Sequence, residues 1–343
     1  MICAGHKRGG EKLKRIVYVF SNGILRRKGN TLAFEVEGER IKYLPIEDIS
    51  SIIVFGEVDF NKKFLELISQ KEILLHYFNY YGYYMGTFYP REHYNSGYMI
   101  LRQAEHYLDE SKRMAIALAF EEGAVRNIRQ VLKYYANRGR GVGGIIERIE
   151  SLAMSNQHCN SISELMAIEG NIRECYYTAF DAIVNKPEFQ FGERSRRPPQ
   201  NYMNALISFG NSILYTTVLA EIYKTHLDPR IGYLHTTNYR RFSLNLDVAE
   251  IFKPILVDRV IFSLIAHGSI TTKSFIEETE GVFLNDKGRK TFIEEIDKRL
   301  GTTIKHRPTG RNVSYRRLIR MELYKLEKHL MGEEPYAPFI AQW

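Results

Sequence analysis

The sequence is poor in cysteine and tryptophan and contains no long apolar run. Only three cysteines and one tryptophan occur among its 343 residues. Cys3, Cys159 and Cys175 are too few for a disulfide framework, and their spacing does not match a zinc site. The start of the chain has no apolar stretch of signal-peptide length. The best membrane candidate, 260–270, is too short and is interrupted by His267. We therefore predict a cytoplasmic protein that does not span a membrane.

Sequence motifs for several common chemistries are also missing. The chain has no G-x-S-x-G nucleophile turn, no H-E-x-x-H motif, no P-loop and no G-x-G-x-x-G after a strand. The glycine-rich segment 137–144 follows a helical pattern, so it lacks the strand–loop–helix context of a phosphate loop. None of these patterns predicts a protein nucleophile or a nucleotide-binding loop.

The composition is that of a globular protein with a basic surplus. Hydrophobic residues make up 44% and charged residues 26% of the chain, which is ordinary for a soluble fold. The length suggests about two domains. Lysine and arginine total 48 against 40 for aspartate and glutamate, so the net charge is +8. This surplus is compatible with binding a polyanion but does not establish it.

The N-terminal part of the chain has the pattern of a small β domain. From Arg15 to Glu57, short alternating apolar runs are separated by turn residues, which is typical of strands. The segment 59–70 changes to helical spacing with Asp59 as a candidate N-cap, and a further strand is expected near 73–78. A single late helix does not give the repeated βαβ alternation of a doubly wound sheet. We predict an N-terminal β-rich domain covering residues 1–91.

A tyrosine-rich segment, 78–92, lies at the end of this domain. Its tyrosines either form a surface that stacks on bases or binds a partner, or belong to a strand pair with the hydroxyl groups at the rim. Of the two, we favour the strand pair.

The rest of the chain, residues 92–343, has helical spacing almost throughout. A first helix is expected to begin at Met99 and to continue past Ser111. Pro254 is expected to kink or restart the last long helical stretch. The other expected helices cover 145–153, 162–184, 201–223 and 252–267. The predicted fold class is therefore α+β, with a small N-terminal β-rich domain followed by a larger all-α C-terminal domain.

Polar residues within apolar helical stretches are the candidates for chemistry. In the first stretch Glu169 and Arg173 lie one helical turn apart, which is also the spacing of a common surface ion pair. In the second, His235 follows a short apolar run. Asp247 and Glu250 are three residues apart, so both carboxylates can point the same way on a helix.

The second stretch contains a set of side chains that suits a metal ion. Ser243 or Asn245 is a candidate N-cap for the helix that carries the two carboxylates. An imidazole with carboxylates is a normal ligand set for a divalent cation that engages phosphate oxygens. A lone histidine such as His235 is nevertheless more often structural, so these residues alone leave both interpretations open.

At these positions the sequence resembles the CRISPR adaptation integrase family, CRISPR-associated protein one. The family signature is Leu-His, then Arg-x-Ser-Leu, then Asp-Leu-x-Glu, followed by an aromatic residue, a basic residue and proline. Val248 stands here in place of the usual leucine between the two acids. The matching residues are Leu234-His235, Arg241-Phe242-Ser243-Leu244, Asp247, Glu250, Phe252, Lys253 and Pro254. Further similar segments are 17–35, 54–58, 168–180, 204–216 and 333–343, so the resemblance covers essentially the whole chain.

The resemblance implies a catalytic site made of Glu169, His235, Asp247 and Glu250. The implied metal ligands are Glu169, His235 and Glu250, and the implied ion is Mg²⁺ or Mn²⁺. Spacing does not decide whether Asp247 is a ligand, a proton acceptor or a supporting residue. Lys253 stands where the family often has arginine, which replaces a two-point phosphate contact by a single charge.

The implied activity is metal-dependent transesterification of DNA. The 3′-hydroxyl of a short double-stranded prespacer attacks a phosphodiester at the edge of a CRISPR repeat, so the DNA supplies the nucleophile. The implied assembly is a homodimer that binds a small companion, CRISPR-associated protein two, with residues 1–91 making the dimer or companion contacts. Two alternatives stay open: a stand-alone structure-selective DNA nuclease and a non-catalytic DNA-binding scaffold.

Basic residues near the C-terminus are the main candidates for DNA contacts. No acidic residue occurs from Lys298 to Met321, although such a segment can also be a solvated loop and helix face. Phosphate contacts of this kind bind without reading base sequence and weaken with salt. The predicted DNA-binding residues are Arg173, Arg241, Lys253, Lys305, Arg307, Arg311, Arg316 and Arg317, and a second candidate group is Arg194, Arg196 and Arg197.

Overall fold

The chain divides into a strand-rich N-terminal unit and a mostly helical C-terminal unit. The computed structural model describes residues 2–4, 14–91, 94, 96–235, 242–306 and 310–342. The two compact units are Met1–His93 and Tyr94–Trp343, so the division falls close to the boundary predicted after residue 91. Strands dominate the first unit and helices the second, which confirms the predicted fold class.

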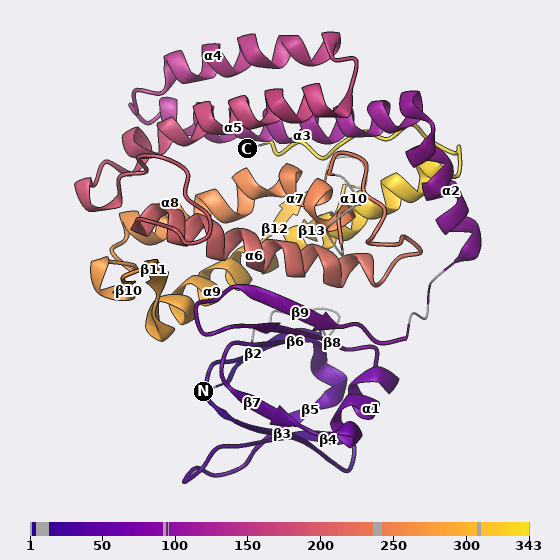
Figure 1. The fold of residues 1–343 in the computed structure, drawn as a ribbon, viewed down its shortest axis with the longest axis vertical. Coiled ribbons are helices and arrows are strands. Elements are labelled where there is room, and N and C mark those ends of the chain that lie inside the picture. The colour runs from indigo at the N-terminus through magenta and orange to yellow at the C-terminus, as the bar shows by residue number, and fades with distance from the viewer. Residues whose placement is uncertain are drawn as a thin grey trace. The chain divides into compact units, whose positions relative to one another are not determined.

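The N-terminal unit contains two β-sheets, labelled in Figure 1. One has the strand order β1-β2-β6-β8-β9 and the other has the order β5-β4-β3-β7. In the first sheet β2, β6 and β8 are parallel, and the outer strands β1 and β9 are antiparallel to their neighbours. The strands are β1 Ile2–Ala4, β2 Arg15–Val19, β3 Gly23–Lys28, β4 Thr31–Glu35, β5 Lys42–Pro45, β6 Ile49–Val54, β7 Val58–Phe60, β8 Leu74–Phe78 and β9 Tyr84–Phe88.

One apolar cluster joins both sheets to the helix α1, Lys62–Gln70. Ile52 from one sheet and Phe34 from the other are both fully buried in it, together with Phe64 of α1. Because α1 connects the parallel strands β6 and β8, the unit contains one βαβ connection. The strand count alone did not predict this connection.

The start of α1 differs from the sequence prediction. The helix begins at Lys62, and its N-cap is Asn61 rather than Asp59. The Asn61 side chain accepts a hydrogen bond from the backbone N–H of Phe64 at 3.1 Å. Asp59 lies in strand β7, where its backbone is extended.

The tyrosine-rich segment, 78–92, contributes the last residue of β8 and all of β9, and these strands pair antiparallel as the favoured interpretation expects. Tyr80 in the turn between them is exposed. The strand pair also includes residues before this segment. Within the strand pair His76 is fully buried, and its Nδ1 lies 2.7 Å from the Thr87 hydroxyl on the paired strand. Burial lowers the pKa of His76 to about 3, so this histidine is neutral in the folded protein near neutral pH.

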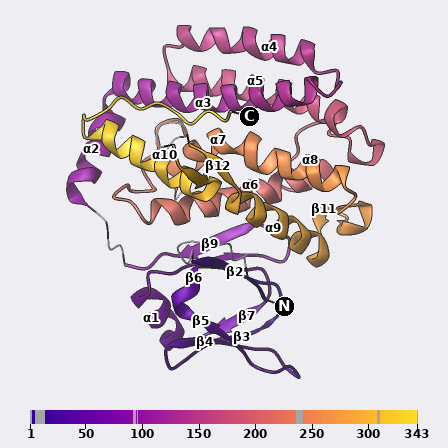
Figure 2. The same cartoon turned by 180° about the vertical axis from the view of Figure 1, so that it is seen from behind.

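The C-terminal unit consists of packed helices and two short hairpins, seen from opposite sides in Figures 1 and 2. The hairpins, β10–β11 and β12–β13, are an addition to the all-α prediction. The helices are α2 Gly97–Leu108, α3 Glu110–Ala136, α4 Gly143–Met154, α5 Ile162–Val184, α6 Tyr202–Ile222, α7 Leu244–Lys253, α8 Arg259–Ala266, α9 Asp286–Gly301 and α10 Tyr315–Leu330. The strands are β10 Phe275–Glu278, β11 Gly281–Leu284, β12 Thr303–Lys305 and β13 Asn312–Ser314.

Two predicted helices are interrupted. The helix expected to continue past Ser111 ends at Leu108, because the Asp109 side chain accepts from the backbone N–H groups of Ser111 and Lys112 and caps the new helix α3. At Pro254 the chain makes a π-helical turn, Pro254–Asp258, that joins α7 to α8.

Helix α7 packs against both α3 and α6 and lies between them in Figure 1. Helix α5 also packs against α3, and its Arg173 side chain reaches Glu250 of α7. All the described side chains of α7 except Leu246 are buried. The position of α7 therefore brings its polar residues into an interior where each of them needs a partner.

Helix α6 is the one described helix that is long and apolar enough to cross a membrane by length and composition. However, 83% of its most apolar window is buried inside the structure. It packs against α7, α10 and β11, as a core helix of a globular unit does.

We predict that His76 makes the stability of the fold depend on pH. The unfolded chain binds a proton at His76 below about pH 6.5, whereas the folded chain does so only near pH 3. The contribution of the neutral His76 to the free energy of unfolding is therefore complete above about pH 6.5 and is lost as the pH falls. Urea unfolding at about pH 7, 6 and 5 should show that wild type loses about 2 kcal/mol more than His76→Leu by about pH 5.

The exposed His158 provides a matched control for this measurement. His158→Leu should lose stability with falling pH as wild type does. Equal pH profiles for wild type and His76→Leu would contradict the assignment of a neutral His76. Thr87 keeps a hydrogen bond in the variant, because its hydroxyl also lies 2.7 Å from the Tyr84 hydroxyl.

Candidate functional site

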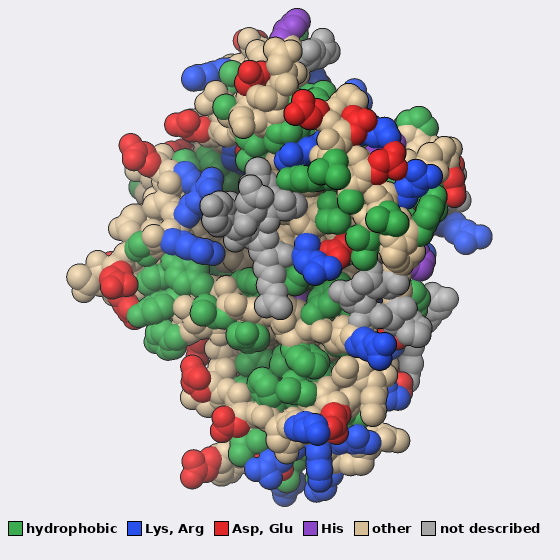
Figure 3. All heavy atoms as spheres, turned by 45° about the vertical axis from the view of Figure 1, so that its right-hand side comes forward, with side chains coloured by type: hydrophobic (Ala, Val, Ile, Leu, Met, Phe, Trp, Pro, Cys, Tyr) green, Lys and Arg blue, Asp and Glu red, His purple; other side chains and the backbone are tan. Residues whose placement is uncertain are grey.

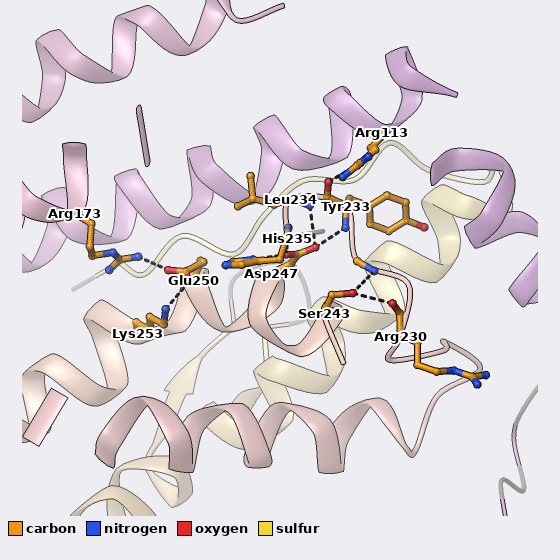
Figure 4. Close-up of polar contacts among 11 residues, drawn as sticks. Arg113, Arg173, Arg230, Tyr233, Leu234, His235, Ser243, Asp247, Glu250 and Lys253 are labelled. Carbon is orange, nitrogen blue, oxygen red and sulfur yellow. Dashed lines mark hydrogen bonds and ion pairs between the residues drawn. The ribbon is translucent and has the colours of Figure 1, made fainter. Parts of the chain in front are cut away.

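Three segments that are distant in sequence meet around α7 in the C-terminal unit (Figure 4). Helix α5 contributes Glu169 and Arg173, the loop before the undescribed residues contributes His235, and α7 contributes Asp247 and Glu250. The sequence prediction had singled out all five, and the contacts below link them in two groups.

Asp247 is fully buried and is the anchor of the first group. Its carboxylate accepts four hydrogen bonds, from the backbone N–H groups of Tyr233, Leu234 and His235 and from His235 Nδ1. The four distances lie between 2.6 and 3.0 Å. Both oxygens therefore have two donors each, which identifies Asp247 as a residue that holds the loop and the histidine.

His235 is oriented by this contact. Its Nδ1 lies 2.7 Å from Asp247 Oδ1, and because a carboxylate only accepts, Nδ1 carries the proton. The ring lies between the carboxylates of Asp247 and Glu250 in Figure 4, with Nε2 on the Glu250 side. A histidine held in this way presents the lone pair of Nε2, which is the arrangement found in many metal sites.

The same loop is tied down at a second point. The Ser243 hydroxyl accepts from the backbone N–H of Gly232 at 2.9 Å and donates to the carbonyl of Arg230 at 2.8 Å. Ser243 occupies the N-cap position of α7 but its side chain does not cap the helix. A Cβ atom at Gly232 would lie 2.8 Å from an Asp247 oxygen, so only glycine allows this close approach.

Glu250 is the centre of the second group. It is 2% exposed, and each of its oxygens is bound by a cation, Oε2 by Arg173 and Oε1 by Lys253. Burial by itself raises the pKa of Glu250, but Lys253, Arg173 and His235 outweigh it and hold this pKa well below its usual value. The carboxyl is therefore ionised despite its burial.

Arg173 links Glu250 to the remaining predicted ligand. Its Nε lies 3.5 Å from Glu169 Oε1, and its Nη2 binds Glu250. No group of three or more His, Cys, Asp or Glu side chains poised to hold a metal ion is present within the described ranges. The physical reason is that the guanidinium of Arg173 contacts both Glu169 and Glu250, so their negative charges are directed at this side chain.

Two buried carboxyls near this group were missed by the sequence analysis. Glu121 on α3 is 1% exposed and Asp258 in the π-helical turn is 2% exposed. Burial and repulsion by Glu169 and Glu250 raise the pKa of Glu121 to about 8. Burial raises the pKa of Asp258 to about 7, against the lowering effect of Arg173.

A signal for Glu121 was present in the helical periodicity. Glu121 is four residues after Ala117 and three before Ala124, both of which are fully or almost fully buried, whereas its neighbour Glu122 is on the exposed face. The sequence signal for Asp258 was weaker. The apolar residues around it could be recognised in the sequence, but the π-helical turn that orients its side chain could not.

The residues predicted to contact DNA fall into different environments. Arg173 and Lys253 are each 8% exposed and are engaged with Glu250. Arg316 is paired with Asp297 at 2.8 Å. Lys305 is exposed on β12. Arg241 and Arg307 lie outside the described residues.

Two of the predicted residues, Arg311 and Arg317, line a pocket of about 580 Å³ beside α10. The other lining residues are Val313, Met321, Tyr324, Lys325, Lys328 and Glu334. Four cations against one carboxylate make its lining positive. In the second candidate group Arg194 is half-buried and binds Asn204 and Ser208, while Arg196 and Arg197 are exposed.

The basic surplus is dispersed on the face of the molecule that Figure 3 shows. Lysine and arginine side chains lie there in several separate groups among acidic and hydrophobic ones. On this face the net charge does not form one continuous basic patch, so individual residues and not the total charge have to be tested.

Comparison with known proteins gives consistent matches. The family model described as CRISPR associated protein Cas1 matches residues 17–298. A similar relative is CRISPR-associated endonuclease Cas1 2 of Thermodesulfovibrio yellowstonii, which is 56% identical over 331 residues, covering 96% of this chain and 100% of the relative.

Solved structures share the same architecture. TM1797, a CAS1 protein from Thermotoga maritima, is 50% identical with a TM-score of 0.86, covering 94% of this chain and 99% of that one. A casposase bound to its integration product has a TM-score of 0.85 at 20% identity, covering 95% and 93% of the two chains. At that identity the second match shows a shared fold.

We predict that Asp247→Asn destabilises the C-terminal unit. The asparagine amide would place an NH₂ group where Asp247 accepts backbone N–H donors, in a position with no exposure to water. Loss of charge-assisted hydrogen bonds of this kind costs about 2–3 kcal/mol, measured as the free energy of urea unfolding.

Asp59→Asn is the control, since Asp59 is an exposed aspartate in strand β7. Its stability should stay within about 0.5 kcal/mol of wild type. If Asp247→Asn is as stable as this control, the carboxylate does not hold the loop as described.

Proposed function

We propose that this chain, which belongs to the Cas1 family of CRISPR-associated proteins, is a metal-dependent DNA integrase of CRISPR spacer acquisition. In the proposed reaction, the 3′-hydroxyl of a short duplex attacks a phosphodiester of repeat DNA. A new phosphodiester forms, and the displaced strand leaves with its own 3′-hydroxyl. Relatives named endonucleases, and the fold shared with a casposase bound to an integration product, support cutting and joining of DNA.

The observation that supports this proposal is that Arg173 contacts both Glu169 and Glu250, with the imidazole of His235 beside Glu250, although within the described residues these side chains are not grouped as a metal site. Two carboxylates and the Nε2 of an imidazole fixed at Nδ1 form a donor set that suits Mg²⁺ or Mn²⁺. These three side chains would hold the ion. When bound, such an ion stabilises negative charge on phosphate oxygens and lowers the pKa of an attacking hydroxyl.

The other residues of the site have supporting roles in this proposal. Asp247 fixes the proton of His235 on Nδ1, which keeps Nε2 available. Lys253 and Arg173 keep Glu250 ionised inside the protein. Because the DNA hydroxyl is the nucleophile, no serine or cysteine nucleophile is required, in agreement with the missing sequence motifs.

The proposed assembly is a cytoplasmic homodimer that binds double-stranded DNA and a companion protein. A solved Cas6-RT-Cas1–Cas2 complex shares the fold of this chain, with a TM-score of 0.85 at 17% identity over 98% of this chain and 37% of that one. This supports Cas2 as the companion. The exposed side chains of Tyr77, Tyr80 and Met85 on the β8–β9 hairpin support a protein contact through the N-terminal unit.

Two other functions share part of the same evidence. A structure-selective nuclease would use the same ion site with water in place of the DNA hydroxyl. A non-catalytic scaffold would bind DNA without using Glu169, His235 and Glu250. The first experiment below separates all three.

We predict that Glu169→Ala, His235→Ala and Glu250→Ala each abolish strand joining. The assay joins a labelled duplex with free 3′-hydroxyl ends into a supercoiled repeat plasmid, with the companion protein and Mn²⁺ present. Each loss should exceed about a hundredfold, because each variant removes a ligand of the ion that stabilises charge in the transition state. DNA affinity should remain within about twofold.

Glu174→Ala is the control, since Glu174 is an exposed glutamate on the same helix as Glu169. It should join DNA like wild type. Cleavage without any joined product would favour the nuclease. Full activity of the three site variants would mean that the site assignment is wrong.

We also predict that Arg311 and Arg317 contact DNA phosphates. Arg311→Ala and Arg317→Ala should each weaken binding for all sequences alike and reduce the slope of log affinity against log salt by about one. Arg316→Ala should change the slope little, because its guanidinium is paired with Asp297 on α9. Fluorescence anisotropy at several salt concentrations measures both quantities, and equal slopes in all variants would contradict the prediction.

A further inference from the structure

The guanidinium of Arg173 contacts the two carboxylates that the proposed function assigns to the ion. Its Nε is 3.5 Å from Glu169 Oε1, and its Nη2 binds Oε2 of Glu250, as Figure 4 shows for the second contact. The side chain of Arg173 is 10% exposed. A positive side chain of the protein is thus engaged with the same negative groups that a cation would need.

This arrangement leaves complementary polar atoms unused. Arg173 Nη1, Glu121 Oε2 and Asp258 Oδ2 are all buried, and none has a hydrogen-bond partner in the part of the chain that the structure describes. Unpaired buried donors and acceptors are unfavourable and rare in native structures. One buried donor and two buried acceptor oxygens near the same site offer a second set of partners for the guanidinium.

These two carboxyls, each with one unpaired oxygen, are close enough to Arg173 to interact with its charge, and Asp258 also interacts with the hydroxyl of Tyr176. Both Glu121 and Asp258 interact electrostatically with the charge of Arg173. They come from α3 and from the π-helical turn after α7, so they approach Arg173 from elements other than its own helix. Neither forms an ion pair among the described residues, whereas Glu122 next to Glu121 is paired with Arg126 at the surface.

We propose that Arg173 is a positioning residue with two positions. Without a metal ion it binds Glu169 and Glu250, and with a divalent cation on those carboxylates it pairs with Glu121 and Asp258. This inference rests on the proposed function, because it takes Glu169 and Glu250 as ligands.

Two consequences follow from this competition. Arg173 stabilises the ion-free site by separating the charges of Glu169 and Glu250. It also lowers the apparent affinity for the cation, because only the fraction of molecules with Arg173 displaced is ready to bind. Glu121 and Asp258 act in the opposite direction, since they stabilise the displaced guanidinium.

The test uses the full chain, with calorimetric titration of Mn²⁺ and thermal unfolding with and without Mn²⁺. Arg173→Met should bind Mn²⁺ at least about tenfold more tightly. Its ion-free melting temperature should fall by roughly 5–10 °C and recover when Mn²⁺ is added. Glu121→Gln and Asp258→Asn should each weaken Mn²⁺ binding about tenfold, with a smaller change in ion-free melting temperature than Arg173→Met shows.

The control is Glu122→Gln on the exposed face of α3, which should change neither quantity. Equal or weaker Mn²⁺ binding by Arg173→Met would overturn the inference. If that variant does not fold, unchanged Mn²⁺ affinity in both Glu121→Gln and Asp258→Asn overturns it instead.

A separate comparison distinguishes this failure from failure of the proposed function. Wild type should bind Mn²⁺, and His235→Ala should lose that binding. If this holds while Arg173→Met binds no more tightly, only the two positions of Arg173 are wrong. If wild type binds no Mn²⁺, the proposed ion site fails, and the inference fails with it.

Discussion

The buried carboxylate of Asp247 is the contact on which the candidate site depends. It accepts hydrogen bonds from three consecutive backbone N–H groups and from the imidazole of His235, and it has no exposure to water. A charge in that position is stable only while all of its acceptor sites are filled. The loop therefore has one conformation compatible with folding of α7, and the orientation of His235 follows from it.

Glu250 is a second buried charge in the same interior, and it is stabilised by a different kind of partner. It lies one turn beyond Asp247 on α7, but its partners are the cationic side chains of Arg173 and Lys253 rather than backbone groups. Backbone donors hold Asp247 in a single arrangement, whereas side-chain cations can move. Asp247 is therefore suited to support the site, whereas Glu250 is suited to the role of ion ligand that the proposed function gives it.

The basic residues of the chain also fall into two groups with different partners. Arg173, Lys253 and Arg316 neutralise carboxylates, while Arg311 and Arg317 line a positive pocket beside α10. The net charge of the chain is therefore a poor guide to a polyanionic ligand, because it also counts cations that are paired with carboxylates inside the fold. Dispersal of basic groups on the face in Figure 3 is consistent with this division.

The sequence alone determined the fold class, the helix Ile162–Val184 and the family signature around His235, because periodicity and local motifs depend on residues close together in the chain. It also placed Asp247 and Glu250 on one helix. Only the tertiary structure decided which partners these carboxylates have. Arg173 and Glu250 are 77 residues apart, and Glu121 and Asp258 enter the site from two further elements. Contacts of this range depend on how helices pack, and neither helical periodicity nor residue spacing contains that information.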